Sequence, residues 1–397
     1  MSRMHPIQAK LDIVERSRTS LLPWRGQFSP ELIEHLIETF CPKAQKLADP
    51  FCGSGTVLAE AMRTGRPAVG IDINPAAYVL SSFSHLLALS PSERAQLAAQ
   101  ATKFISPHVE VDGDLFRAEQ IVPTSIASVV AAAEEPRLRL LLHVGALIGC
   151  GDSTDLSLWK LAKGVQSVLR TLAKFEAPRS RVEVLLGDAR HELSAHRCDA
   201  IITSPPYINV FNYHQNYRPI MEHLGWTPLA CAIAEIGANR KHRQNRFLTV
   251  TQYCMDMALL FRAGRAALED DGTFVIVLGR ESNVLRTAFY NGDLIDEVVE
   301  ATGYLAVAGR HERVFQNRFG ASIYEDILVL RPNSKVGLAE AKCLEAAREI
   351  GVASLQEALS RAPEDARPLI EQAIEGGSGV KPSAHPKVAK SPLWPAF

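Results

Sequence analysis

The sequence of 397 residues predicts an α/β fold with a mostly parallel, doubly wound sheet. Three observations lead to this prediction. Short apolar runs alternate with amphipathic segments along most of the chain, which is typical of strands joined by helices. Two of the strand candidates end in loops with special backbone chemistry, one rich in Gly and one in Pro. The last two strand candidates follow each other with no helix between them, which predicts an antiparallel hairpin at one edge of the sheet.

The first elements are expected to form one strand-helix-strand unit. Apolar spacing predicts a helix over 30–40, followed by a short strand that ends at Asp49. A second helix is expected from Val57 to Arg63, because its Ala and Leu residues favour helix. A second strand, 67–72, ends in the carboxylate of Asp72.

The later elements continue the alternation. Strands are expected at 182–186, 198–203 and 273–279, with a helix over 251–268 and a turn at 270–272 before the last of these strands. Residues 313–315 and 324–330 are expected to form the closing hairpin. In such sheets ligands bind beyond the carboxyl ends of the strands, which is where both special loops fall.

The Gly-rich loop that follows the first strand is the stronger of the two signals. Its sequence is Asp49-Pro50-Phe51-Cys52-Gly53-Ser54-Gly55-Thr56. Gly53 and Gly55 allow backbone angles closed to other residues and a close approach of a ligand. A triphosphate loop would need Lys after its last Gly, and a dinucleotide loop would need Gly where Leu58 stands. The spacing from this loop to Asp72 instead suits a carboxylate that holds a ribose.

The second loop is Thr203-Ser204-Pro205-Pro206-Tyr207. Two consecutive prolines fix the main chain and remove two N–H donors, so the loop offers carbonyl acceptors. Such acceptors suit the hydrogens of a planar amine, and the ring of Tyr207 suits stacking on the base that carries it. The structural alternative is a Pro-Pro turn with a surface Tyr.

The two loops together resemble the S-adenosylmethionine-dependent amino-methyltransferases that modify DNA bases at an exocyclic nitrogen. The resemblance extends from about Trp24 to Arg331. It implies a Rossmann-like methyltransferase fold, S-adenosylmethionine as the cofactor and double-stranded DNA as the partner. Ser in first place and Tyr in last place are typical of the cytosine-N4 branch, although adenine-N6 enzymes with this motif exist. The cofactor loop precedes the catalytic loop here, whereas many cytosine-N4 enzymes have the opposite order.

The resemblance also implies roles for individual residues. The catalytic residues would be Ser204, Pro205, Pro206 and Tyr207, acting on a base swung out of the duplex. Three of the residues in the cofactor set given next have structural alternatives. Phe28 could equally be a hydrophobic staple, and Asp188 could equally be a helix N-cap. Cys52 is expected to pack against its neighbours and not to act as a nucleophile. The cofactor would be bound by Phe28, Ser29, Asp49, Pro50, Phe51, Cys52, Gly53, Ser54, Gly55, Thr56, Asp72, Ile73, Asp188 and Ser204.

The net charge of −1 requires that positive charge for DNA binding be local. The run 239–246 follows the catalytic loop, and aromatic and amide side chains lie just before it. The alternative for this run is a solvated loop. The predicted DNA contacts are Asn212, Tyr213, Arg240, Lys241, Arg243 and Arg246.

Four parts of the chain are expected to have different roles. Residues 1–81 would be the cofactor-binding first part of the methyltransferase domain, and 82–181 a helical insertion with helices at 92–104, 138–147 and 156–175. Residues 182–332 would be the catalytic second part, with a target-contact loop at 208–250. Residues 333–397 would form a helical extension and a flexible tail.

Several classes of protein are disfavoured by the sequence. No apolar run approaches a membrane span, and the start lacks a secretory apolar core, so a soluble, cytoplasmic protein is expected. The seven cysteines include no Cys-x-x-Cys pair, so neither a metal site nor disulfides are expected. No nuclease-like cluster of acids is evident, so a partner restriction endonuclease would be a separate chain.

Two other functions stay open. One is an RNA base amino-methyltransferase. Several such enzymes have a separate N-terminal RNA-binding module, for which the short segment before the cofactor segment is expected to leave no room. The other is a cofactor sensor without catalysis, which would not need the Ser-Pro-Pro-Tyr loop.

Overall fold

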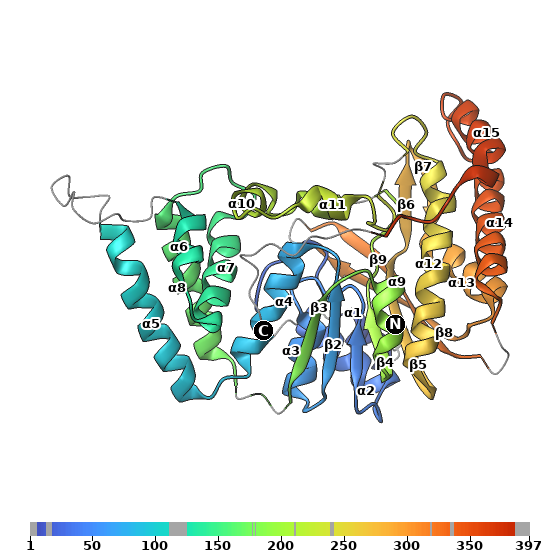
Figure 1. The fold of residues 1–397 in the computed structure, drawn as a ribbon. Coiled ribbons are helices and arrows are strands. Elements are labelled where there is room, and N and C mark those ends of the chain that lie inside the picture. The colour runs from blue at the N-terminus through green and yellow to red at the C-terminus, as the bar shows by residue number, and fades with distance from the viewer. Residues whose placement is uncertain are drawn as a thin grey trace.

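The computed structural model describes residues 6–12, 18–110, 125–176, 178, 180–209, 212–238, 242–317, 320–333 and 337–385. At its centre is a seven-stranded sheet in the order β3-β2-β1-β4-β5-β9-β8 (Figure 1). The strands from β3 to β5 pair in parallel, and β9 pairs antiparallel with both β5 and β8. The predicted α/β sheet with an antiparallel terminal hairpin is therefore confirmed. Its strands are β1 Leu47–Asp49, β2 Ala68–Asp72, β3 Val182–Leu186, β4 Cys198–Thr203, β5 Leu268–Gly279, β8 Leu305–Gln316 and β9 Ser322–Pro332.

The strand order reverses between β1 and β4. From β1 the chain adds strands outward through β2 to β3, then returns to place β4 on the other side of β1. Ligands bind at such a reversal, beyond the carboxyl ends of the two strands. The Gly-rich loop follows β1 and the Ser-Pro-Pro-Tyr loop follows β4, so the topology brings these two loops together.

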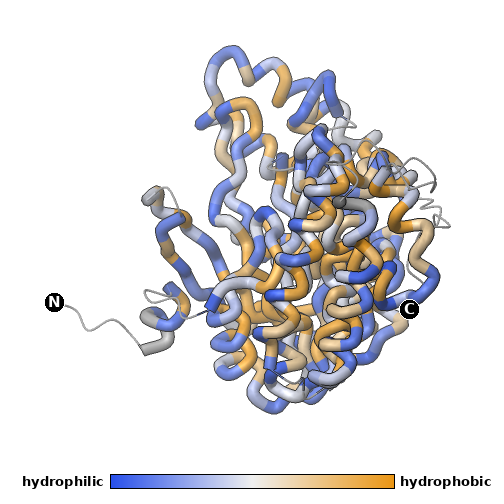
Figure 2. Tube along the Cα trace, turned by 90° about the vertical axis from the view of Figure 1, so that its left-hand side faces the viewer, coloured by the Kyte–Doolittle hydropathy of each residue, from blue (hydrophilic) through white to orange (hydrophobic). Residues whose placement is uncertain are grey.

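Both faces of the sheet are buried, because successive side chains of a strand point to opposite faces. In β5, Phe274 and Ile276 belong to one core and Val275 and Val277 to the other. Figure 2 shows the result: hydrophobic residues run through the middle of the body and hydrophilic ones lie toward its rim. One face is covered by α1 Pro6–Asp12, α2 Pro30–Phe40 and α3 Thr56–Arg63. The other is covered by α9 Ala189–Glu192, α12 Leu248–Ala267, α13 Asn291–Thr302, α14 Glu340–Ala358 and α15 Arg367–Gly376.

The predicted helical insertion lies to one side of the sheet (Figure 1). Helix α4, Pro75–Leu87, begins with an N-cap at Asn74 and contacts β2, β3 and α7, so the expected boundary at 81/82 falls inside a helix that joins the sheet to the insertion. The helices beyond it share one core with α4. They are α5 Pro91–Glu110, α6 Ile126–Ala132, α7 Pro136–Cys150 and α8 Leu158–Lys174.

The region above the sheet contains short elements. After β4 the chain crosses from the insertion toward the sheet through α10 and α11 (Figure 1). These elements are the 3-10 helix η3 Tyr213–Gln215, α10 Arg218–His223 and α11 Pro228–Ala232. Another 3-10 turn, η2 Leu193–Ala195, follows α9, and a separate hairpin pairs β6 Glu281–Val284 with β7 Thr287–Tyr290.

Three local expectations are wrong. The turn expected at 270–272 is a bulge inside β5, where Leu268 pairs with Cys198 and Thr273 with Ala200. The helix expected to end at residue 104 instead continues, as α5, through Pro107 to Glu110.

The third concerns the C-terminal segment, which is docked up to residue 385 where a flexible tail was expected. After the 3-10 turn η4 Gly377–Gly379, the backbone N–H of Ser383 donates to Asp256 at 2.8 Å. The remainder of the expected tail lies outside the described residues.

Two findings bear on the excluded classes. Within the described ranges, no helix combines the length and apolar character that a membrane crossing requires. All seven cysteines are buried free thiols.

Candidate functional site

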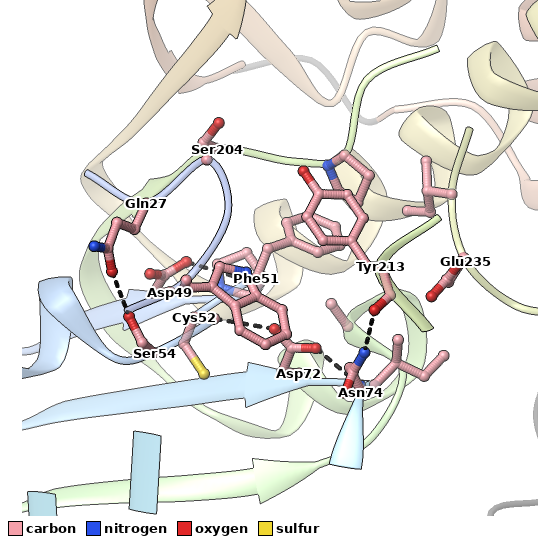
Figure 3. A pocket seen from close by; sticks show the side chains of 18 of the residues that line it. Gln27, Asp49, Phe51, Cys52, Ser54, Asp72, Asn74, Ser204, Tyr213 and Glu235 are labelled. Carbon is pink, nitrogen blue, oxygen red and sulfur yellow. Dashed lines mark hydrogen bonds between the residues drawn. The ribbon is translucent and has the colours of Figure 1, made fainter. Parts of the chain in front are cut away.

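An open pocket of about 990 Å³, which includes adjoining solvent, lies at the carboxyl ends of β1, β2 and β4. Its walls come from the segment before α2, the Gly-rich loop, the ends of β2 and β3, the Ser-Pro-Pro-Tyr loop and the segment before α12. Figure 3 shows Ser204, Asp49 and Gln27 on one side of the pocket and Glu235, Tyr213 and Asn74 on the other. The two loops singled out by the sequence thus line one cavity.

The Gly-rich loop is bent by its two glycines. Gly53 and Gly55 have φ of +50° and +85°, angles that strain residues with a side chain. A Cβ on Gly53 would lie 2.8 Å from the Trp24 ring, and one on Gly55 would lie 3.2 Å from the Ser81 backbone. Both positions therefore need glycine for conformation and for space.

Asp49 joins the ends of the two central strands. Its Oδ1 accepts a hydrogen bond from the Thr203 hydroxyl at 2.7 Å and another from the Phe51 N–H at 3.1 Å. Thr203 is the last residue of β4, so this side chain fixes the start of one loop to the start of the other. Burial raises the pKa of Asp49 to about 7, against the lowering effect of these hydrogen bonds.

Asp72 holds the Gly-rich loop from the end of β2. Its Oδ2 accepts from the Gly53 N–H at 3.0 Å and its Oδ1 from the Asn74 N–H at 2.9 Å. Burial raises the pKa of Asp72 to about 6. Each oxygen keeps a second lone pair, which is available to a ligand hydroxyl.

An aromatic stack closes one side of the pocket. Trp24 stacks on Tyr213, with ring centroids 6.3 Å apart, and on Tyr217, at 6.1 Å. Asp152, from the helical insertion, accepts from the Tyr217 N–H at 2.7 Å and pairs with Arg25 at 3.0 Å. The insertion therefore helps to hold this wall in place.

The Ser-Pro-Pro-Tyr loop is positioned mainly by packing. The Ser204 hydroxyl and the Tyr207 hydroxyl share a hydrogen bond at 3.1 Å. A Cβ on Gly279 would lie 2.9 Å from the Tyr207 ring, and one on Gly237 would lie 2.4 Å from the Tyr207 carbonyl oxygen. Burial raises the pKa of Tyr207 above its ordinary value, so its hydroxyl stays protonated at neutral pH.

Asp188 lines the pocket and is also the N-cap of α9. Arg190 donates to both of its oxygens, at 2.9 Å from Nε and 2.6 Å from Nη2, and also contacts Asp256. Burial raises the pKa of Asp188, but the hydrogen bonds and charge of Arg190 outweigh burial, so the net direction is downward. The predicted N-cap is therefore present, and the predicted contact with the cofactor stays a prediction.

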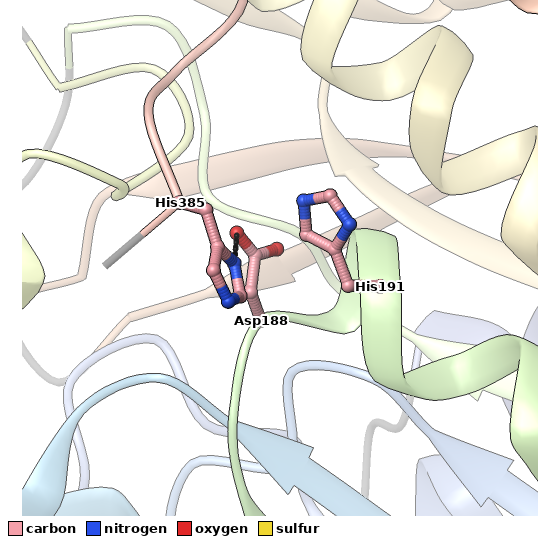
Figure 4. Close-up of side chains that lie close together, drawn as sticks. All are labelled: Asp188, His191 and His385. Carbon is pink, nitrogen blue, oxygen red and sulfur yellow. Dashed lines mark ion pairs between the residues drawn. The ribbon is translucent and has the colours of Figure 1, made fainter. Parts of the chain in front are cut away.

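Asp188, His191 and His385 form the one trio of possible metal ligands within the described part of the chain (Figure 4). His385 Nδ1 lies 3.7 Å from Asp188 Oδ2. Since Arg190 already occupies both Asp188 oxygens and brings a positive charge, these contacts suit docking of the C-terminal segment better than cation binding.

Most of the predicted cofactor residues line the pocket; the two exceptions are Ser29 and Gly55. In the catalytic loop, Pro205 is not part of the lining. Ser29 is the N-cap residue of α2, and its hydroxyl makes no cap hydrogen bond. Cys52 lines the pocket but is buried, and burial holds the pKa of its thiol well above the ordinary value, as packing requires.

The predicted DNA contacts separate into three groups. Asn212, Arg243 and Arg246 are exposed. Tyr213 lies in the pocket wall, where its ring stacks on Trp24, and its contact with DNA stays a prediction. Arg240 and Lys241 lie outside the described residues.

Sequence reasoning missed two polar residues of the pocket. Asn74 donates from Nδ2 to the Tyr213 carbonyl at 2.9 Å, and the pair Asn74-Pro75 was a recognisable helix start. Glu235 lines the pocket and is 4% exposed. It had no sequence signal, because it follows β4 by more than thirty residues in an irregular segment.

Comparison with known proteins links the first part of the chain to a family. A family model described as DNA methylase matches residues 11–82, which include the Gly-rich loop and Asp72. The resemblance to the amino-methyltransferases is confirmed in this part of the chain. The family match implies S-adenosylmethionine as methyl donor, as the sequence predicts.

Two relatives are Type II methyltransferases. M.MjaII of Methanocaldococcus jannaschii is 37% identical over 65 residues, which cover 15% of this chain and 12% of that protein. M.BsoBI of Geobacillus stearothermophilus is 21% identical over 264 residues, which cover 51% of this chain and 52% of the relative. The chain therefore spans about half or less of the length of these relatives.

Solved structures give only distant matches. TrmN from Thermus thermophilus has a TM-score of 0.34 and 14% identity, over 78% of this chain and 50% of TrmN. The rRNA methyltransferase aviRa from Streptomyces viridochromogenes has a TM-score of 0.33 and 13% identity, over 85% of this chain and 96% of aviRa. Matches at this level add nothing to the fold described above.

The residues of the pocket fit S-adenosylmethionine. Asp72 offers carboxylate lone pairs where ribose hydroxyls would bind, and Ile73 and Pro206 offer apolar surface for a base. The lining also contains the carboxyl group of Asp49, which suits a ligand with a positively charged sulfur.

Proposed function

We propose that this protein transfers a methyl group from S-adenosylmethionine to the exocyclic N4 amine of a cytosine in double-stranded DNA. The observation that carries the proposal is the shared pocket: Ser204, Pro206 and Tyr207 line the same cavity as Asp72 and the Gly-rich loop. The DNA methylase match over residues 11–82 supports DNA as the substrate.

The chain's own residues would hold the cofactor at two ends. Asp72 accepts hydrogen bonds from the ribose, and the Gly-rich loop lets the cofactor approach the main chain. The Ser54 hydroxyl donates a hydrogen bond to Gln27 Oε1 at 2.9 Å, which keeps the segment before α2 over the Gly-rich loop. When bound, S-adenosylmethionine supplies an electrophilic methyl carbon attached to a positively charged sulfur.

The target amine would be oriented by the second loop. An exocyclic amine is a weak nucleophile because its lone pair is delocalised into the ring. Ser204 and the Pro205 carbonyl accept its hydrogens, and the Tyr207 ring stacks on the base. The nitrogen forms a bond to the methyl carbon as the carbon–sulfur bond breaks toward sulfur, and the amine then releases one proton to solvent.

Most of the rate enhancement would come from orientation, since the loop lies in one wall of the pocket and is fixed by packing on Gly279 and Gly237. The base would have to leave the duplex to enter this pocket. A separate restriction endonuclease would be a natural partner of such an activity.

The experiment that tests the proposal is transfer of labelled methyl from S-adenosylmethionine to DNA and RNA. We expect label in double-stranded DNA and none in RNA. Label in RNA alone would support the RNA base methyltransferase instead. Cofactor binding without any transfer to either polymer would support a cofactor sensor.

A further inference from the structure

Glu235 is a buried acid in the pocket that the proposed mechanism does not use. It lies between α11 and α12, and its backbone N–H donates to the Cys231 carbonyl at 3.1 Å. Its side chain is 2% exposed, yet the residue belongs to the pocket lining. The carboxyl group points toward the end of the pocket where Asp72 and Asn74 lie (Figure 3).

Only one of the two carboxyl oxygens is satisfied by the residues that the structure describes. Oε2 lies 2.8 Å from His214 Nδ1, in a pair that is itself buried. Oε1 is buried and has no hydrogen-bond partner among those residues. A buried carboxyl oxygen without a donor is costly, and nearly all such groups in proteins have one. A donor on a ligand in the pocket would satisfy it.

The neighbours of Glu235 indicate which part of the ligand donates. The negative charge of Glu235 is among the causes, after burial, that raise the pKa of Asp72, so the two carboxylates are electrostatic neighbours. In Figure 3, Ser204, at the reacting end of the site, lies on the opposite side of the pocket from Glu235. A ribose has two adjacent hydroxyls, and Asp72 already accepts one backbone N–H on each oxygen.

We propose that Glu235 accepts a hydrogen bond from a ribose hydroxyl of S-adenosylmethionine, as a second carboxylate beside Asp72. This inference rests on the proposed cofactor of the site and adds a residue to it. The competing explanation is that Glu235 serves only to hold His214 and the segment before α12.

The test is calorimetric binding of S-adenosylhomocysteine and of its 2′-deoxy and 3′-deoxy analogues. Glu235→Gln is expected to weaken binding of S-adenosylhomocysteine about tenfold, the effect of losing a hydrogen bond to a charged group. For the analogue that lacks the bonded hydroxyl, wild type and variant should bind equally. The control His214→Gln keeps a donor for Oε2 and should change all three affinities by less than about threefold.

Equal weakening of all three ligands by Glu235→Gln, or no weakening of any, would overturn the proposal. Glu235→Asp, which withdraws the carboxylate by one methylene, should give the same dependence on the ligand and serves if the amide variant does not fold. If wild type does not bind S-adenosylhomocysteine, both this inference and the proposed function fail. If it binds but Glu235→Gln has no effect, the inference alone fails.

Discussion

The two loops that meet at the reversal of the sheet are held by different forces. The Gly-rich loop is fixed by carboxylates, with Asp49 and Asp72 each accepting a backbone N–H from it. The Ser-Pro-Pro-Tyr loop has two prolines without an N–H, and it is fixed largely by packing on Gly237 and Gly279. A carboxylate holds the second loop only at its first residue, where Thr203 donates to Asp49. Cofactor binding should therefore depend on pH through Asp72, and the orientation of the target amine mainly on packing.

The largest effect is expected from truncating the second loop. Ser204→Ala and Tyr207→Ala should each reduce methyl transfer at least about 100-fold, because the amine loses its orientation. The dissociation constant for S-adenosylhomocysteine should change by less than about threefold. Single-turnover transfer and calorimetric binding measure the two effects separately.

A milder variant sharpens the same comparison. Tyr207→Phe keeps the ring and removes the hydroxyl with its hydrogen bond to Ser204, so it should retain more transfer than Tyr207→Ala. Full activity in either alanine variant would contradict the roles assigned to this loop.

The next largest effect concerns Asp72. Asp72→Asn should weaken cofactor binding about tenfold at pH 7.5, since a charged acceptor is lost. In wild type, affinity should fall as the pH drops through about 6, where Asp72 takes up a proton. The variant should lose the change in affinity that is centred near pH 6. A wild-type affinity that is constant from pH 5 to 8 would show that Asp72 does not contact the cofactor.

A smaller effect is expected for DNA. Arg243 and Arg246 are exposed beside the segment that precedes α12. If each meets a phosphate, replacing both with Gln should weaken DNA binding severalfold and reduce the salt dependence by about one counterion per contact.

The control for this prediction is Arg197→Gln, because Arg197 pairs with Glu269 near the amino-terminal ends of β4 and β5. If the double variant binds DNA with the same salt dependence as wild type, Arg243 and Arg246 do not contact the phosphates.

The last prediction concerns stability without ligand. The pKa of Asp49 is raised to about 7 in the folded protein and is close to 3.8 when unfolded. The folded state then binds the proton more tightly, so stability falls as pH rises from about 4 to about 7 and levels off above it. Asp49→Asn removes this contribution. The difference in Tm, variant minus wild type, should therefore be larger at pH 8 than at pH 5. A constant difference would contradict the raised pKa.

The sequence predicted the sheet and the cofactor half of the site well, for local reasons. Gly53, Gly55 and Asp72 lie within one strand-helix-strand unit, and each acts through backbone geometry or a strand end. Helix 30–40 was predicted with its observed bounds, because its apolar spacing and Pro30 agree.

The rest of the site depends on contacts between distant parts of the chain. Tyr213 stacks on Trp24, which lies almost two hundred residues earlier in the sequence. Glu235 reaches the pocket through an irregular segment, and Ser383 docks on Asp256 from an apparent tail. No local pattern encodes such pairings.

The most direct test of the central claim is nucleoside mass spectrometry of double-stranded DNA after incubation with the protein and S-adenosylmethionine. The two-loop pocket predicts a methyl group on an exocyclic nitrogen, as N4-methylcytosine, with none in the Ser204→Ala reaction. N6-methyladenine would keep the mechanism and change the base. A methyl group on a ring carbon, or none at all with cofactor bound, would contradict the account.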